Sequence, residues 1–303
     1  MRTHHLFSAC ILLALLCNQG QAQTPNSAKR FFDRGKKDFA AGDFSGAIEQ
    51  YSRAIEASSR LDGEKPDSAN GSVTIIDPFT AKAYVARGIA RYQEHFIDDA
   101  AADFNSALRI DPALSEAYLG RGVIYRLHGD LDSARADFDR ALSINPRLTQ
   151  AFIDRADVRI ERQDLDGART DLESAMRIDG KAAEAYSLLG HVDMLQGQSI
   201  SAMERFEQAM KLNPKLPSPY HERGTLYMKL GQLDRAVADF TRALELNPAI
   251  PVAYINRGLT FLIQGKDAEA QKDFAQSLNL NPEGKADLDR RIKLAKEFRE
   301  IKQ

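Results

Sequence analysis

The chain has 303 residues, with 41 Lys and Arg against 43 Asp and Glu, so that its formal net charge is −2 at pH 7. This near balance argues against a nucleic-acid-binding protein, which would usually carry a strong basic excess. Hydrophobic residues make up 43% of the chain and no low-complexity tract interrupts it, which favours a folded protein over a disordered one.

Residues 1–22 are predicted to form a secretory signal peptide. Arg2 provides a positive start, the run Leu6–Leu16 is apolar, and Gly20 and Ala22 supply small residues at the usual cleavage spacing. The apolar run is shorter than the roughly 20 residues that a membrane-spanning helix needs. We therefore expect cleavage after Ala22 and a periplasmic or secreted mature chain; an uncleaved N-terminal anchor is the alternative.

Both cysteines of the chain, Cys10 and Cys17, lie inside this predicted signal peptide. The mature chain would then have no cysteine, which excludes disulfides, cysteine–zinc sites and thiol chemistry. Leu16 stands directly before Cys17, where a lipoprotein would need a small residue, so lipid attachment is not expected. No later segment is apolar enough to enter a membrane, so we expect no integral membrane span.

A repeat of 34 residues organises the rest of the chain. The stretch ADFDRALSINP at Ala136–Pro146 returns as ADFTRALELNP at Ala238–Pro248, three steps of 34 further on. Stepping by 34 defines six blocks without a gap: 81–114, 115–148, 149–182, 183–216, 217–250 and 251–284. A seventh, weaker block fits at 28–61. Residues 62–80 are expected to form an insert loop, and residues 285–303 a capping helix.

Each block is predicted to form two helices joined by a turn. Position 20 is alanine in all seven blocks, position 8 is small and position 4 is aromatic. Positions 4, 8 and 11 share one helical face, and positions 20, 24 and 27 share another. Small residues there let two helices approach closely, while aromatic side chains fill the space beside them. Glycine is frequent at position 15, in the turn, and proline at position 32 ends the second helix.

This pattern closely resembles the tetratricopeptide repeat (TPR) family over nearly the whole predicted mature chain. In block 217–250 the resemblance is carried by Tyr220, Gly224, Tyr227, Gly231, Ala236, Phe240, Ala243 and Pro248. It implies an all-α, right-handed superhelical α-solenoid of seven helix-turn-helix repeats with a C-terminal capping helix. It also implies a scaffold, and not an enzyme, that binds a protein or peptide partner in its concave groove.

The predicted capping helix has an amphipathic pattern. Leu288, Ile292, Ala295 and Phe298 recur at helical spacing among many charged residues. One face would pack on the last repeat and the other would meet water, which is what the end of a repeat array requires.

A second pattern runs through the same blocks. Position 7 is arginine in six blocks and position 23 is aspartate in five, whereas block 183–216 departs at both positions, with Leu189 and Arg205. We therefore expect an ion pair between the two helices of a block, whose bidentate contact would set the helix register. The alternative is two solvated charges worth under about 1 kcal/mol.

By the same resemblance, positions 2, 5, 9, 12 and 13 of the first helix line the groove. The candidate peptide-binding residues are Val85, Ile89, Tyr92, Leu119, Val123, Arg126, Asp157, Glu161, His191, His221, Ile255, Leu259 and Leu262. Much of this surface is apolar, and its middle, with Asp154 near Asp157 and Glu161, is acidic, which would suit a peptide carrying a basic residue. The alternative is that the apolar residues are core contacts and the acids merely solvate the surface.

The sequence contains no motif G-x-x-x-x-G-K-[ST], G-x-G-x-x-G, G-x-S-x-G or H-E-x-x-H. His191 and His221 lie at groove positions of successive blocks, with Glu222 as a candidate third ligand. A metal site needs three or four ligands, so we expect polar groove residues and neither a metal nor another cofactor. An enzyme or small-ligand-binding protein using these histidines is the alternative function. The sequence indicates neither the partner nor the oligomeric state.

Overall fold

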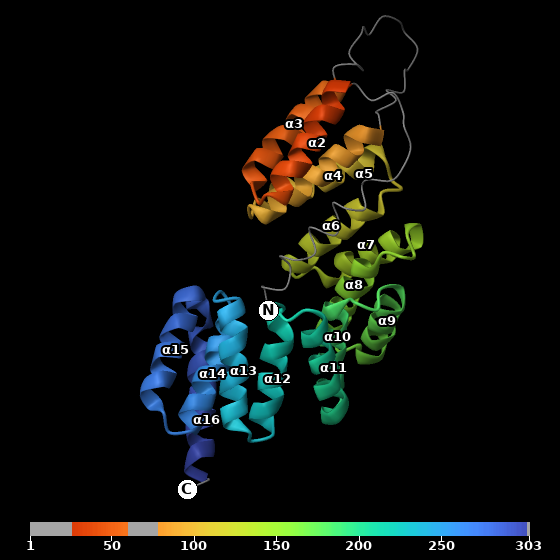
Figure 1. Ribbon diagram of the computed structural model, residues 1–303. Helices are drawn as coiled ribbons and strands as arrows, with labels where there is room; N and C mark the ends of the chain where they lie inside the picture. Colours follow the sequence, from red (N-terminus) through yellow and green to blue (C-terminus); the bar gives the residue numbers. More distant parts are fainter. Residues whose placement is uncertain (1–25, 60–77, 302–303) are drawn as a thin grey trace, which may run out of the picture. The chain divides into compact units, whose positions relative to one another are not determined.

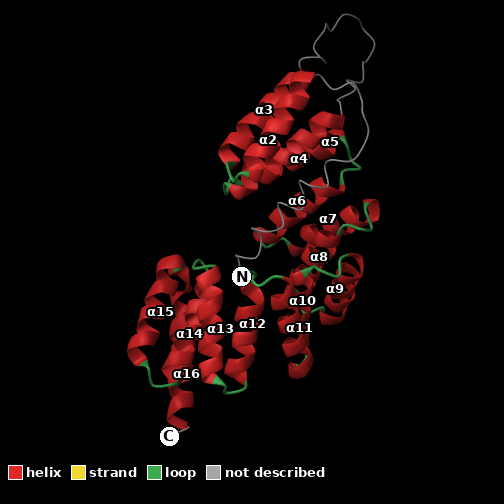
Figure 2. Cartoon of the chain, in the orientation of Figure 1, coloured by secondary structure: helices red, strands yellow, loops and turns green. Residues whose placement is uncertain are grey.

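The computed structural model describes residues 26–59 and 78–301. Within these residues the structure is entirely helical, with fifteen α-helices, one short 3-10 helix and no strand (Figures 1 and 2). The predicted signal peptide, its two cysteines and residues 62–77 of the predicted insert lie outside the described residues. The all-α class that the repeat predicted is confirmed.

The chain divides into two compact units, and the division falls between residues 158 and 159 of the sequence. The N-terminal unit, here called unit N, contains α2 (Asn26–Ala40), α3 (Phe44–Ser59), α4 (Pro78–Gln93), α5 (Ile97–Ile110), α6 (Ser115–Leu127), α7 (Leu131–Ile144) and most of α8 (Thr149–Glu161). Helix α2 packs against α3, α4 against α5 and α6 against α7; between pairs, α3 contacts α4 and α5 contacts α6. Unit N is therefore a stack of helix pairs (Figure 1).

The second unit, unit C, is itself built from paired helices. It contains α9 (Leu165–Ile178), α10 (Ala183–Leu195), α11 (Ser199–Leu212), α12 (Pro217–Lys229), α13 (Leu233–Leu246), α14 (Pro251–Ile263), α15 (Asp267–Leu280), the 3-10 helix Pro282–Gly284 and α16 (Lys285–Ile301). Helices α10 and α11, α12 and α13, and α14 and α15 form pairs that stack in order. Among the described residues, none of the helices has the length and apolar composition needed to cross a membrane.

Helix α4 starts earlier than the repeat pattern predicted. It begins at Pro78, inside the range 62–80 that was assigned to the insert. Proline is favourable in the first turn of a helix, and the next two residues contact the first repeat. The ring of Phe79 packs edge-on against Phe32, with 5.2 Å between the ring centroids. The hydroxyl of Thr80 donates a hydrogen bond to the hydroxyl of Ser58 at 2.7 Å. These contacts give the last residues of the expected insert a helical conformation.

The predicted capping helix corresponds to α16, which packs on α14. Leu288 and Ala295 are buried, and Ile292 packs beside them against Leu259 and Leu262 of α14. Phe298, which was also expected on the packed face, is 46% exposed. The cap thus covers the end of the last helix pair with one face, as the amphipathic pattern predicted.

Close approach of the two helices in a repeat depends on the small residue at position 8. In the pair α6–α7, a Cβ atom added to Gly122 would lie 2.6 Å from the ring of Phe138, which is fully buried. Gly190 with Phe206, and Gly258 with Phe274, have the same geometry. The glycine therefore makes room for the aromatic ring at position 24.

Replacing Gly122 by alanine should destabilise unit N, because the added methyl group overlaps the Phe138 ring. We expect a loss of about 1–3 kcal/mol, the usual cost of overpacking a core, measured by urea unfolding. Block 149–182 carries Ala156 and Leu172 at the same two positions. The double variant Gly122→Ala/Phe138→Leu copies that natural combination and should recover part of the loss; no recovery would contradict the proposed overlap.

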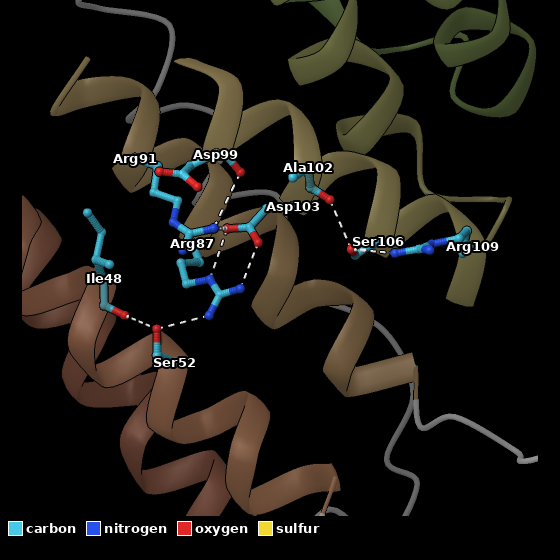
Figure 3. A network of polar contacts seen from close by, with 9 residues as sticks. All are labelled: Ile48, Ser52, Arg87, Arg91, Asp99, Ala102, Asp103, Ser106 and Arg109. Atoms are coloured by element: carbon cyan, nitrogen blue, oxygen red, sulfur yellow. Dashed lines mark hydrogen bonds and ion pairs between the residues drawn. The ribbon is translucent and has the colours of Figure 1, made fainter. Parts of the chain in front are cut away.

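The arginine at position 7 joins three helices. In α4, Arg87 donates Nε and Nη2 to the two carboxylate oxygens of Asp103 in α5, at 2.9 and 2.7 Å, and donates Nη1 to Ser52 in α3 at 3.0 Å (Figure 3). Asp103 also forms an ion pair with Arg91, with an N–O distance of 2.8 Å. One guanidinium thus holds the two helices of its own repeat together and ties them to the preceding repeat.

The same bidentate contact recurs along the chain, which confirms the predicted pairing in these repeats. The further pairs are Arg121 with Asp137, Arg223 with Asp239, and Arg257 with Asp273. The link to the preceding repeat was not predicted from the sequence. Its acceptors stand at position 25, as in Ser52, Asn105 and Thr241. A polar residue at that position in successive blocks was the available signal.

The repeat 183–216, which lacks both the arginine and the aspartate, uses a reversed contact. Arg169 of α9 donates Nη2 to Asp193 of α10 at 2.6 Å and to Gln196 at 2.7 Å. Arg205, at position 23, lies 4.0 Å from the same buried Asp193. Here the arginine comes from the preceding repeat and the aspartate from the first helix. An arginine–aspartate ion pair is therefore kept at this junction, but the two residues come from other positions than in the other repeats.

Candidate functional site

The thirteen predicted groove residues all lie on the first helices of the repeats: α4, α6, α8, α10, α12 and α14. Six of them are buried apolar residues: Val85, Ile89, Leu119, Val123, Leu259 and Leu262. Ile255 is partly buried against the core that α14 forms with the cap. Burial favours the interpretation of these six as core contacts, because a buried side chain offers a ligand no surface. Their part in peptide binding stays a prediction.

The polar residues gather in two places. In unit N, Arg126 donates Nη1 to Asp157 at 2.6 Å, with side chains 5% and 23% exposed. Tyr92 lies close to the same groups, and burial raises the pKa of its phenol to about 12. Glu161 is exposed at the end of α8. The predicted acidic centre is therefore partly neutralised by an arginine that was itself predicted as a groove residue.

Asp154 is the buried centre of this group. Only 2% of the residue is exposed; Gln150 donates to its Oδ1 at 3.3 Å, while its Oδ2 has no hydrogen-bond partner. Burial raises the pKa of the Asp154 carboxyl to about 7, which Arg126 opposes and Asp157 reinforces. Tyr92, Arg126, Gln150, Asp154 and Asp157 are called the Asp154 cluster below. They come from α4, α6 and α8.

In unit C, the two predicted histidines meet at one carboxylate. Nδ1 of His191 lies 2.8 Å from one oxygen of Glu222, and Nδ1 of His221 lies 3.3 Å from the other. Asn256 donates Nδ2 to Nε2 of His221 at 3.1 Å, which assigns the proton of His221 to the nitrogen that faces Glu222. Nη2 of Arg291, in the cap, donates to the other end of the Asn256 amide at 2.5 Å. A continuous polar chain therefore runs across α10, α12, α14 and α16.

Glu222 stays ionised in this setting. Burial alone would raise its pKa, but hydrogen bonds from His191 and His221 hold the pKa of the carboxyl well below its ordinary value. Both ring nitrogens of His221 are engaged, one by Glu222 and the other by Asn256. Across the described ranges, no group of three or more His, Cys, Asp or Glu side chains is placed to hold a metal ion.

The residue at position 6 of the first helix was the available sequence signal for both polar groups, the one around Asp154 and the one around Glu222. It is Ala86 and Gly120 in two blocks, but Asp154, Glu222 and Asn256 in three others. From the sequence, Asp154 and Glu222 were predicted only as neighbours of groove residues, and Asn256, Gln150 and Arg291 were not predicted. Polar residues at a position that is alanine or glycine in two other blocks indicate contacts between successive first helices.

Comparisons with known proteins agree with this architecture. Family models described as tetratricopeptide repeat match residues 85–148, 217–249, and 183–216 together with 251–283, which is more than half of the chain. No curated protein sequence matches.

Solved structures of similar fold cover most of the chain. A tetratricopeptide repeat protein from Parabacteroides merdae is 19% identical, with a TM-score of 0.65 over 89% of this chain and 98% of that one. A chain of the APC/C hetero-tetramer Cut9-Hcn1 is 16% identical, with a TM-score of 0.65; the match covers 95% of this chain and 63% of that one. The structure of pilF from Pseudomonas aeruginosa is 18% identical, with a TM-score of 0.57; the match covers 74% of this chain and 97% of that one. At these identities the likeness shows the fold.

Paired helices in tandem create a continuous core and, beside it, an extended surface for partner proteins. The periodic sequence, the stacked helix pairs and the matching family models all lead to the same assignment. The chain is a protein-interaction scaffold in architecture, and it belongs to the tetratricopeptide repeat family.

Proposed function

We propose that the chain is an exported scaffold that binds a protein or peptide partner along the face made by the first helices of its repeats. The observation that carries this proposal is the gathering of partly buried polar side chains from successive first helices. The Asp154 cluster joins α4, α6 and α8. The hydrogen-bonded residues His191, His221, Glu222 and Asn256 join α10, α12 and α14. Polar groups placed among apolar side chains are what gives a binding surface its specificity.

A small-ligand site or enzyme at the two histidines is the competing function. His191 and His221 do share one carboxylate, as a general base and its orienting acid would. Both nitrogens of His221 are engaged by neighbouring side chains, however, which leaves that ring no nitrogen for a substrate. This arrangement favours a role for Glu222 in connecting repeats, and so favours the scaffold.

Export rests on residues 1–22 and has a direct test. The exported protein should begin at Gln23 and carry no lipid, because the small residues Gly20 and Ala22 stand at the cleavage spacing. Intact-mass measurement of protein recovered from the periplasm or medium checks this. A mass that includes Cys17 with an attached acyl chain would contradict it.

Photo-crosslinking tests where the partner binds. Benzoylphenylalanine at Glu161 or Lys229, exposed residues at position 13 of two first helices, should capture the same partner in the native compartment. The same group at Arg135 or Glu204, exposed on second helices, should not capture it. Capture from the second helices alone, or no capture from Glu161 and Lys229, would contradict binding on the first-helix face.

A further inference from the structure

Helix α2, the first described helix of unit N, carries a stripe of exposed basic side chains. It contains five basic and two acidic residues, whereas the whole chain has a net charge of −2. Arg30, Arg34 and Lys37 are exposed, and their spacing of four and three residues places them along one side of the helix. These three residues are called the α2 stripe below. Lys29, next to Arg30, is also exposed, and the exposed acid Asp33 offsets one of the four charges.

Arg30 and Lys37 stand where the six later repeats bury uncharged side chains. The buried residues are Ala83, Ala117, Ala151, Ala185, Pro219 and Ala253 at position 3, and Ala90, Ile124, Val158, Val192, Leu226 and Thr260 at position 10. In unit C this side of a first helix packs on the preceding second helix, as Leu226 does beside Ala202 and Phe206 of α11. The α2 stripe is therefore the surface at which the described stack of unit N ends.

The end surface of a repeat array must be polar, but it does not need charges of one sign. The residues of the α2 stripe have the spacing at which like charges on a helix repel each other and destabilise it. Among the described residues, none of the three forms an ion pair. Position 23 of this block is the neutral Gln50, so Arg34 lacks the aspartate that pairs with Arg121 and its counterparts. The exposed charges of the cap, α16, are instead paired within their helix: Arg290 with Asp287, and Lys293 with Glu297. Contact with water alone does not explain the α2 stripe.

We propose that the α2 stripe binds the anionic phosphate headgroups of a lipid membrane and so holds the scaffold at a membrane surface. Clusters of Lys and Arg on one helix are attracted to a negatively charged bilayer, and each such residue raises the affinity roughly fivefold. The stripe occupies positions 3, 7 and 10 of its block, whereas the groove is expected at positions 2, 5, 9, 12 and 13. Membrane binding is therefore an activity beyond the proposed partner binding and uses a different surface.

The chemistry of the stripe favours a lipid surface over an acidic protein. A stable protein interface has a core of apolar and aromatic side chains. None of the described side chains of α2 is an exposed large hydrophobic residue, and its aromatic residues Phe31, Phe32 and Phe39 are buried or half-buried. Charge is thus the main attraction that the stripe offers. A bilayer presents many phosphates in one plane and attracts cations without needing an apolar anchor.

Vesicle flotation of the mature chain, which begins at Gln23, measures this binding. In dilute buffer the chain should bind vesicles that contain about one-third phosphatidylglycerol; it should lose most of that binding at about 0.5 M salt, and should not bind pure phosphatidylcholine. The variant Arg30→Gln/Lys37→Gln should bind at least tenfold more weakly, because two of the attracted charges are removed. Lys211→Gln/Lys215→Gln, which removes two exposed cations from unit C, is the matched control and should bind like the unaltered chain.

The variant Arg30→Lys/Lys37→Arg keeps both charges and should also bind like the unaltered chain. Equal binding by Arg30→Gln/Lys37→Gln, or no binding to phosphatidylglycerol vesicles, would overturn the proposal, and so would equal binding to pure phosphatidylcholine. Retention on immobilised polyglutamate without binding to vesicles would assign the stripe to an acidic protein and would overturn it as well. None of these results bears on partner capture at Glu161 and Lys229, so binding on the first-helix face is tested separately.

Discussion

Replacing Asp137 by alanine is expected to lower the free energy of unfolding by about 3 kcal/mol, at the lower end of the usual cost of breaking a buried ion pair. Asp137 is 2% exposed, and it binds Nε and Nη2 of Arg121 at 2.7 and 2.9 Å. The Arg121 side chain is only 16% exposed, so its charge cannot return fully to water once the carboxylate is removed. Asn105 remains as a neutral partner at 2.7 Å and limits the loss.

A double-mutant cycle isolates the pair from its surroundings. The variants are Asp137→Ala, Arg121→Leu and the two together, compared by urea unfolding followed by circular dichroism. The double variant should be more stable than Asp137→Ala, because no stranded charge is left, and Leu189 shows that the fold accepts leucine at this position. Arg140→Ala removes the exposed 3.4 Å contact to the same carboxylate and should cost under about 1 kcal/mol. A coupling energy near zero would show that Arg121 and Asp137 do not interact.

Replacing Asp154 by asparagine should stabilise the protein at pH 8 and change little at pH 4. Burial raises the pKa of Asp154 from 3.8 to about 7, so the folded state binds a proton more tightly than the unfolded state. The stability that this proton contributes is complete below pH 4 and is lost as the pH rises to about 7. A change in pKa of this size corresponds to about 4 kcal/mol, the most that the substitution could recover at pH 8.

Unfolding in urea between pH 4 and pH 8 measures this dependence. The unaltered chain should lose more stability than Asp154→Asn as the pH rises through 5 to 7, and the two curves should run parallel above pH 8. Asp98→Asn is the matched control, because it removes an exposed carboxylate from the same unit. Parallel curves over the whole range would show that Asp154 titrates normally and is not buried as described.

The sequence alone determined the repeat, the helix pairs and the cap. A period of 34 residues, with alanine at position 20 and a small residue at position 8, admits one helix-pair geometry, because two helices approach closely only where side chains are small. The recurring Arg121–Asp137 type of pair was also predictable, because arginine at position 7 and aspartate at position 23 occur together in five blocks and are both replaced in block 183–216. These features depend on residues within one repeat or between adjacent repeats.

Which first-helix residues reach solvent was decided only by the tertiary structure. Val123 and Asp157 stand at the same position of successive repeats, yet Val123 is buried and Asp157 is partly exposed. Burial at this position depends on how far the neighbouring first helix covers it. The periodic sequence pattern gives Val123 and Asp157 the same position and so does not distinguish a covered residue from an exposed one. The contacts of His191 and His221 with Glu222, and of Asn256 with His221, likewise need three successive repeats in their packed positions. Periodicity determines which residues share a helix face, whereas packing between repeats determines their exposure and partners.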